Sequence, residues 1–218
     1  MKRCEWCESP RDARDAGLYI QYHDTEWGVP VFDDRKHFEF LVLESAQAGL
    51  SWITILKKRE NYRRAYDNFD VEKAARYTEK KKERLLADPG IVRNRLKIEA
   101  SITNARKFLE IQKEFGSFSN YIWGFAENGA PGGAANGRRD PAVKNRKACF
   151  RPVVGKWKSL SELPARTELS DKIAADMKKR GFRFLGSIIL YSHMQATGIV
   201  NDHITSCFRY GEIKRMYR

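Results

Sequence analysis

The segment Phe38–Trp52, with the sequence FEFLVLESAQAGLSW, decides the fold of this 218-residue chain. Its apolar residues recur at helical spacing, and Gly49 is a good terminator before a second helix that would carry Trp52. Glu44 lies among the apolar side chains, where a carboxylate costs free energy unless it has a partner or a task. Two interpretations stay open: Glu44 bonds a neighbouring donor in the core, or it faces a pocket that has Trp52 as a wall.

The flanking sequence continues the helical pattern. Asp33 or Asp34 can cap the helix that holds Glu44, and Ser51 can cap the next helix. Nowhere does the sequence alternate apolar and polar residues over a sustained run bounded by turns, so it predicts an all-α fold. Further helices are expected over residues 53–69, 71–87 and 91–115.

Composition narrows the class of protein. The chain has 41 Lys and Arg against 28 Asp and Glu, a net charge of +13, which favours a polyanionic partner. It contains no apolar run of about 18 residues and no signal-peptide core after its first residues, so we expect a soluble, intracellular protein without a membrane partner. Four cysteines are too few for a disulfide scaffold and are expected to be thiols or metal ligands. They are Cys4, Cys7, Cys149 and Cys207.

The composition changes between Glu127 and Lys156, where glycine, proline, asparagine and basic residues replace the helical pattern. These residues do not build a helix core. We expect a long, mobile, positively charged loop over residues 128–156, and Cys149 lies within it without an obvious partner.

Two helices joined by a short glycine-bearing turn are expected over residues 170–198. Ser170 can cap the first of them and Gly181 can end it; the second runs from Ile188 to Thr197. Backbone N–H groups at the start of the second helix suit a phosphate, whereas the alternative is an ordinary helical corner with solvated cations. The candidate phosphate-binding residues are Lys179, Arg180, Arg183 and Gly186.

Residues from both ends of the chain can form a metal site. His203 and Cys207 are four residues apart, so on a helix they would share a face. Together with Cys4 and His23 they permit a Cys2His2 zinc site that ties the termini together. Cys7 is an alternative ligand, because a C-x-x-C pair can also supply two sulfurs.

Five segments together carry a resemblance that runs over nearly the whole chain. They are LYIQYHDTEWGVP, LESAQAGLSWITILKKRENYRRAY, PGIVRNRLKI, KKRGFRFLGSIILYSHMQATG and VNDH. The chain resembles the 3-methyladenine DNA glycosylase I family, bacterial base-excision repair enzymes of the helix-hairpin-helix superfamily. The resemblance implies one glycosylase domain over residues 1–218, with the hairpin at 170–198 and an insertion within 128–156. It also implies one structural zinc ion on Cys4, His23, His203 and Cys207. The base pocket that it implies contains Glu44, Tyr22, Trp52, Trp6 and Tyr19.

The activity that the resemblance implies is release of 3-methyladenine from double-stranded alkylated DNA by a cytoplasmic, monomeric enzyme. The methylated base is cationic, so aromatic faces and a carboxylate would recognise it after it is flipped out of the duplex. Glu44 is the expected recognition and catalytic residue. Nothing in the sequence points to a Schiff-base lysine, so we expect a monofunctional enzyme without a lyase step.

Three alternatives accompany this interpretation. Asp202 lies where many helix-hairpin-helix glycosylases carry an essential aspartate, but it could instead orient its neighbour His203. A zinc-stabilised DNA-binding module without catalysis would share the charge and the hairpin. A zinc hydrolase would need an open coordination position, which four candidate ligands argue against.

Overall fold

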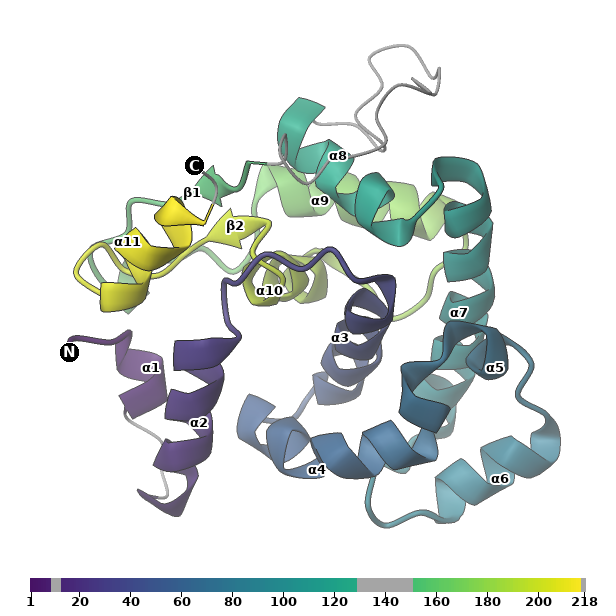
Figure 1. Cartoon of the computed structure of the whole chain (residues 1–218). Helices are drawn as coiled ribbons and strands as arrows, with labels where there is room; N and C mark the ends of the chain where they lie inside the picture. Colours follow the sequence, from purple (N-terminus) through teal and green to yellow (C-terminus); the bar gives the residue numbers. More distant parts are fainter. Residues whose placement is uncertain (9–12, 129–150, 217–218) are drawn as a thin grey trace.

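The computed structural model describes residues 1–8, 13–128 and 151–216. Within these residues it has eleven α-helices and two strands of two residues each (Figure 1). The prediction of an all-α fold is confirmed. The two short strands, which the sequence did not predict, pair in parallel, with Val153 opposite Val200. The expected basic loop and Cys149 fall largely on residues 129–150, outside the described residues. The α-helices are α1 (Glu5–Glu8), α2 (Ala13–Thr25), α3 (Asp34–Gln47), α4 (Trp52–Ala65), α5 (Val71–Ala75), α6 (Glu79–Ala87), α7 (Arg95–Phe115), α8 (Phe118–Asn128), α9 (Glu168–Lys179), α10 (Ser187–Ala196) and α11 (Phe208–Arg215), and the strands are β1 (Val153–Val154) and β2 (Val200–Asn201).

Helix α3 is the central element, and all its residues from His37 to Ala46 are buried. The side chain of Asp33 caps it by accepting a hydrogen bond from the amide of Lys36 (2.8 Å), which confirms one of the two expected caps. Its apolar side chains divide between two clusters. Phe38 packs in the main core with α4–α10, whereas Phe40 packs with Tyr22, Trp27 and Cys207 in a second cluster formed with the chain termini. A helix that is apolar all round in this way belongs in the interior.

The start of α4 differs in detail from the expectation. Ser51 occupies the N-cap position, but its hydroxyl contacts Thr54 Oγ1 (2.8 Å) and makes no capping bond. The hydroxyl of Tyr19 instead accepts the amide of Ile53 (3.1 Å). A side chain from α2 therefore satisfies the free N–H group that Ser51 was expected to bond.

The single helix expected over residues 71–87 is wrong. The segment forms two helices, α5 and α6, and each has its own side-chain cap: Asp70 accepts from the amide of Lys73, and Thr78 accepts from that of Lys81. The second cap is the physical reason for the break, because Thr78 is extended at φ −88° and ψ 170°.

The helix-hairpin-helix is confirmed as a structural element, with one change at its start. Thr167, not Ser170, is the N-cap of α9, and Ser170 is its reciprocal partner in a capping box. Gly181 at φ +91° follows the end of α9, and α10 begins after Gly186. The turn is fixed to α7 by Asn104, whose amide group bonds both the N–H (2.8 Å) and the C=O (2.9 Å) of Arg183.

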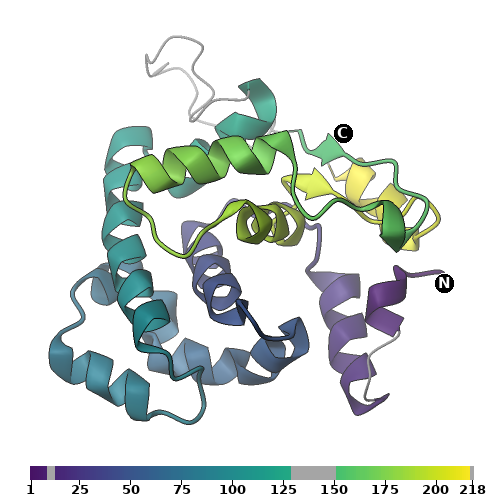
Figure 2. The same cartoon turned by 180° about the vertical axis from the view of Figure 1, so that it is seen from behind.

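The two ends of the chain lie side by side. In both views α1 and α2 lie against the C-terminal segment that carries β2 and α11 (Figures 1 and 2). The amide of Phe208 bonds the carbonyl of Lys2 (3.0 Å), which joins the two ends directly. Among the described residues, no helix combines the length and the apolar character needed to cross a membrane.

Candidate active site and metal centre

A cavity of about 230 Å³ lies between α2, the α3–α4 corner and α10. All five residues expected to form a base pocket line it: Glu44, Tyr22, Trp52, Trp6 and Tyr19. Cys4, Trp27, Gln47, Gln195 and Asp202 are among the other lining residues. The cavity therefore combines aromatic walls with the two buried carboxyl groups of Glu44 and Asp202, in a volume suited to a small planar molecule.

Aromatic rings form most of the wall. The rings of Tyr22 and Trp52 lie 5.5 Å apart between centroids, and those of Trp6 and Tyr19 pack edge to face at 5.6 Å. Trp6 also packs against Trp27 (5.2 Å). Because Trp6 lies in α1, this contact makes the N-terminal helix part of the wall. Such faces attract cations through their quadrupoles and stack on planar rings.

Helix α3 buries two acids, and their surroundings differ. Glu39 is paired with Arg59 (2.8 Å) and Lys36 (3.1 Å), and these cations lower its pKa despite burial. Glu44 has no lysine or arginine partner among the described residues, and burial raises its pKa well above the ordinary value. The ion pairs with Arg59 and Lys36 therefore account for the burial of Glu39, whereas Glu44 is a buried acid without a lysine or arginine partner among the described residues.

Two polar atoms of the cavity residues are buried and lack a hydrogen-bond partner among the described residues. They are Glu44 Oε1, an acceptor, and Trp52 Nε1, a donor. Unsatisfied buried groups are rare and costly in folded proteins, and they mark positions where a ligand can complete the bonding. The other oxygen, Glu44 Oε2, lies 3.0 Å from His193 Nδ1, which holds the carboxyl group in place.

Asp202 is part of the cavity wall and does not contact the His203 ring in any described hydrogen bond. Its carboxylate accepts from Trp157 Nε1 (2.7 Å), the Tyr191 hydroxyl (2.5 Å) and Gln195 Nε2 (3.0 Å). The carbonyl of Trp27 orients His203 instead, by accepting from its Nε2 (3.0 Å). The interpretation of Asp202 as the group that orients His203 is therefore wrong.

The candidate phosphate-binding residues divide into two groups. Lys179, Arg183 and Gly186 are exposed on the hairpin. Arg180 is instead engaged by Glu114 (2.6 Å) and Asp176 (2.7 Å), and its guanidinium lies over the ring of Phe115. These ion pairs argue against a phosphate contact by Arg180 and give it a role in packing α9 against α7.

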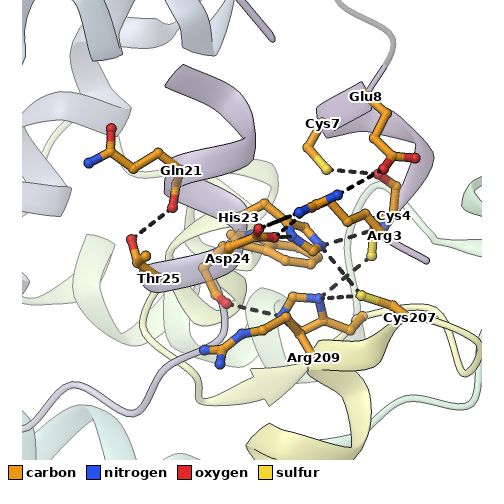
Figure 3. Close-up of polar contacts among 12 residues, drawn as sticks. Arg3, Cys4, Cys7, Glu8, Gln21, His23, Asp24, Thr25, Cys207 and Arg209 are labelled. Carbon is orange, nitrogen blue, oxygen red and sulfur yellow. Dashed lines mark hydrogen bonds and ion pairs between the residues drawn. The ribbon is translucent and has the colours of Figure 1, made fainter. Parts of the chain in front are cut away.

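The four expected metal ligands come together at the junction of the termini. Figure 3 labels three of them, Cys4, His23 and Cys207. The ligand atoms of Cys4, His23, His203 and Cys207 are buried and all lie within 4.8 Å of one another. Cys207 Sγ is 3.5 Å from His23 Nε2 and 3.6 Å from His203 Nδ1. A tetrahedral zinc ion with ordinary bond lengths would separate its sulfur and nitrogen ligands by about 3.6 Å.

The surroundings of the cluster also suit a metal. His23 Nδ1 donates to Asp24 (2.7 Å), so on a neutral ring its other nitrogen, Nε2, is the acceptor that faces Cys207 Sγ (3.5 Å). Asp24 is in turn held by Arg3 (2.9 Å). The hydrogen bond with Cys4 lowers the pKa of the Cys207 thiol, which favours the thiolate, the form that binds metals.

Two expectations for this cluster need correction. His203 and Cys207 do not lie on one helix: a turn connects them, and Cys207 is the N-cap residue of α11. Cys7 is buried beside the cluster, but its thiol donates to the carbonyl of Cys4 (3.0 Å) and is not one of the four grouped ligands.

Comparison with known proteins agrees with this combination of cavity and hairpin. The family model described as methyladenine glycosylase matches residues 12–210. The chain belongs to the methyladenine glycosylase family. DNA-3-methyladenine glycosylase 1 of Escherichia coli K12 is 43% identical over 210 residues, covering 96% of this chain and 97% of that protein.

Solved structures of the family have the same fold. A crystal structure of 3-methyladenine DNA glycosylase I superposes with a TM-score of 0.79 at 45% identity, covering 95% of this chain and 98% of the other. A variant crystallised in complex with 3-methyladenine has a TM-score of 0.78 at 32% identity, covering 95% and 97%.

This member of the methyladenine glycosylase family also has site residues that sequence reasoning missed. His193 contacts Glu44, and His37 contacts His193 with Nδ1 to Nε2 at 3.1 Å. Both are fully buried polar residues in apolar helical segments, HFEFLVL and IILYSHMQ. The same signal singled out Glu44 and could have identified them.

Proposed function

We propose that this chain is a DNA-3-methyladenine glycosylase, which hydrolyses the N-glycosidic bond to 3-methyladenine in alkylated DNA. The observation that carries this function is the cavity, where an unpartnered acceptor and an unpartnered donor lie among aromatic faces. Family membership and the relatives' names support the same activity. The function is one of base-excision repair.

The cavity residues select the base by its charge. N3-methylation makes the adenine cationic while it is attached to the sugar, so the base is already a good leaving group. Stacking on Tyr22 and Trp52 favours the cationic ring over neutral adenine. Glu44 Oε1 accepts a hydrogen bond from the edge of the base, and such a bond is stronger when the donor is charged. The nucleotide is first flipped out of the duplex, because the cavity residues do not reach a base that is stacked inside it.

Hydrolysis then needs only water at the sugar carbon. No lysine lies among the described residues that line the cavity, which supports a monofunctional reaction without a Schiff base. Asp202 lines the same cavity as Glu44 and is held by three donors, so it can stabilise positive charge developing on the sugar. Its bonds to Trp157 and Tyr191 fix its orientation for that task.

The hairpin supplies the contact with DNA. Lys179 and Arg183 are exposed on it, and the N-terminus of α10 after Gly186 offers free amide groups to a phosphate. We assign these three residues to the backbone of double-stranded DNA. This contact positions the duplex and leaves recognition to the cavity.

The metal cluster holds one structural zinc ion in this proposal. Two thiol and two imidazole ligands close the coordination shell, which is the arrangement of structural zinc sites. The ion would tie α1 and α2 to the C-terminal segment and so fix Trp6 and Tyr22 in the cavity wall. The proposal treats the chain as one glycosylase domain, acting as a monomer in the bacterial cytoplasm, where its DNA substrate lies.

Chromatography of the bases released from methylated DNA tests the function. We expect 3-methyladenine in the soluble fraction and intact, uncleaved abasic DNA. Specific DNA binding without any released base would indicate a binding module and would overturn the proposal. Strand cleavage at the abasic site would contradict the monofunctional reaction alone.

A further inference from the structure

A line of buried hydrogen bonds runs from the cavity into the core behind Glu44. Glu44 Oε2 lies 3.0 Å from His193 Nδ1, and His193 Nε2 lies 3.1 Å from His37 Nδ1. His37 Nε2 ends the line at the carbonyl oxygen of Val31 (3.0 Å). Both imidazoles are fully buried, and Glu44 is 3% exposed. The line therefore has little contact with solvent, and its Glu44 end opens to the cavity.

The number of protons in this line follows from its acceptor end. The Val31 carbonyl only accepts, so His37 Nε2 carries a proton and His37 Nδ1, on a neutral ring, accepts. His193 Nε2 then donates to it, which leaves His193 Nδ1 as an acceptor facing Glu44. Three hydrogen bonds need three protons, and two neutral imidazoles supply only two. The third comes from the carboxyl group of Glu44.

We propose that His193, backed by His37, is a positioning residue that holds this third proton for Glu44 and takes it up when a cationic base enters the cavity. The O–H bond at Glu44 Oε2 then breaks, and an N–H bond forms at His193 Nδ1. Glu44 becomes a carboxylate against the cation without releasing a proton to solvent. When the glycosidic bond is cleaved and the base becomes neutral, the proton returns to Glu44.

The surroundings support a neutral line in the free protein. Burial raises the pKa of Glu44 and lowers that of His193 to about 3; burial and the neighbouring ring lower that of His37 to about 3. The rings of Phe40 and Phe118 cover the histidines without charge. The titratable and charged groups that face the line come from several elements. They are Tyr22 of α2, Asp33 and Asp34 at the start of α3, Arg59 of α4 with its partners Glu26 and Glu39, Lys97 of α7, which donates to a carbonyl group at the end of α3, and Asp202 after β2.

The first test uses the free wild-type protein and is independent of activity. Nitrogen-15 NMR of labelled histidine reports which ring nitrogens carry protons. We expect Nε2 protonated and Nδ1 unprotonated in both His37 and His193. A His193 ring that is protonated at Nδ1 and unprotonated at Nε2 would overturn the inference.

The second test rests on the proposed function and measures the single-turnover rate of 3-methyladenine release from methylated DNA between pH 6 and 8. In the wild type the proton stays within the line, so the rate should vary little. In His193→Phe the proton of Glu44 must leave to solvent, so the rate should fall about tenfold for each pH unit below the pKa of Glu44, up to about a hundredfold between pH 8 and pH 6, the change for one proton. An unchanged pH profile with a uniformly lower rate would make His193 a packing residue.

Thr197→Val, at the C-cap of the same helix, is the matched control. Its hydroxyl donates to the carbonyl of His193 (2.6 Å) but does not join the line, so the variant should be less stable and keep the flat profile. Should His193→Phe not fold, the NMR measurement decides alone. Should the wild type release no base, the proposed function fails while the NMR result still tests the proton count.

Discussion

At the scale of single residues, the orientation of Asp202 depends on a glycine. A Cβ at Gly155 would lie 2.6 Å from Asp202 Oδ1 and would overlap Trp157 Nε1, the donor that holds this carboxylate. The same glycine donates its amide to the carbonyl of Asn201 (3.0 Å), so the backbone is held close to the side chains. Only a residue without Cβ fits this approach.

Gly155→Ala should therefore break the bond between Trp157 and Asp202 and slow base release. Overpacking of this kind typically lowers the free energy of unfolding by about 1–3 kcal/mol. Gly17→Ala is the control, because nothing lies within 4 Å of a Cβ at that exposed helical position. It should raise the melting temperature slightly, since alanine is about 0.5–1 kcal/mol better than glycine inside a helix. Equal melting temperatures and release rates in wild type and Gly155→Ala would contradict the account of Asp202.

At the scale of secondary-structure elements, the hairpin is built by residues that lie far apart in the sequence. Asn104 of α7 fixes the turn through both backbone groups of Arg183, and Arg180 joins α9 to Glu114 at the end of α7. The cations of the hairpin therefore have different tasks. Arg180 holds the element in place, while Lys179 and Arg183 face outward.

Substitution of these cations should separate the two tasks. Lys179→Ala and Arg183→Ala should weaken DNA binding about equally for all sequences, and each should reduce the salt dependence by about one phosphate contact. Arg180→Ala should instead lower the melting temperature, because it removes the ion pairs with Glu114 and Asp176. The measurements are binding isotherms over a series of salt concentrations, together with thermal melts. A change in base preference with an unaltered salt slope would refute the assignment of the hairpin.

The sequence predicts those elements whose signals are local. Asp33 caps α3 as expected, and Gly181 follows the end of α9 as expected. The errors arise where a distant side chain replaces a local one, as when Tyr19 bonds the amide that Ser51 was expected to cap. Glu44 and Trp52 were singled out from the sequence itself, as one of two open interpretations, whereas Tyr22, Trp6 and Tyr19 were predicted through the resemblance to a family. The partner of Glu44, His193, is 149 residues away and has no local signal that links the two.

At the scale of the whole molecule, the metal cluster joins the two ends of the chain next to the cavity. Cys4 contributes both to the cluster and to the cavity wall, and Trp27 lies between them, 4.5 Å from the His203 ring. If the cluster holds the proposed zinc ion, its loss would therefore loosen the wall that holds Trp6 and Tyr22, in addition to freeing the termini.

Cys207→Ala should lower zinc content and melting temperature together, while protein that remains folded keeps its preference for 3-methyladenine over adenine. A structural ion stabilises the fold and takes no part in recognition. Zinc content is measured by elemental analysis and selectivity by base release. Wild-type protein that is free of metal yet folded, with an unchanged melting temperature, would show that the cluster holds no structural ion.

The central claim is that Glu44 is buried for the base and not for the fold, and paired substitutions of the two buried acids of α3 test it most directly. Glu44→Gln can still donate to His193 and keep a free oxygen towards the cavity, so its melting temperature should stay near wild type. It loses the charge, so single-turnover release of 3-methyladenine should fall at least tenfold, about 1.5 kcal/mol, the lower end for a bond to a charged group. Glu39→Gln should lower the melting temperature and leave the release rate near wild type, because it breaks the buried pair with Arg59 and leaves the cavity intact. A lowered melting temperature with an unchanged release rate in Glu44→Gln would contradict the account.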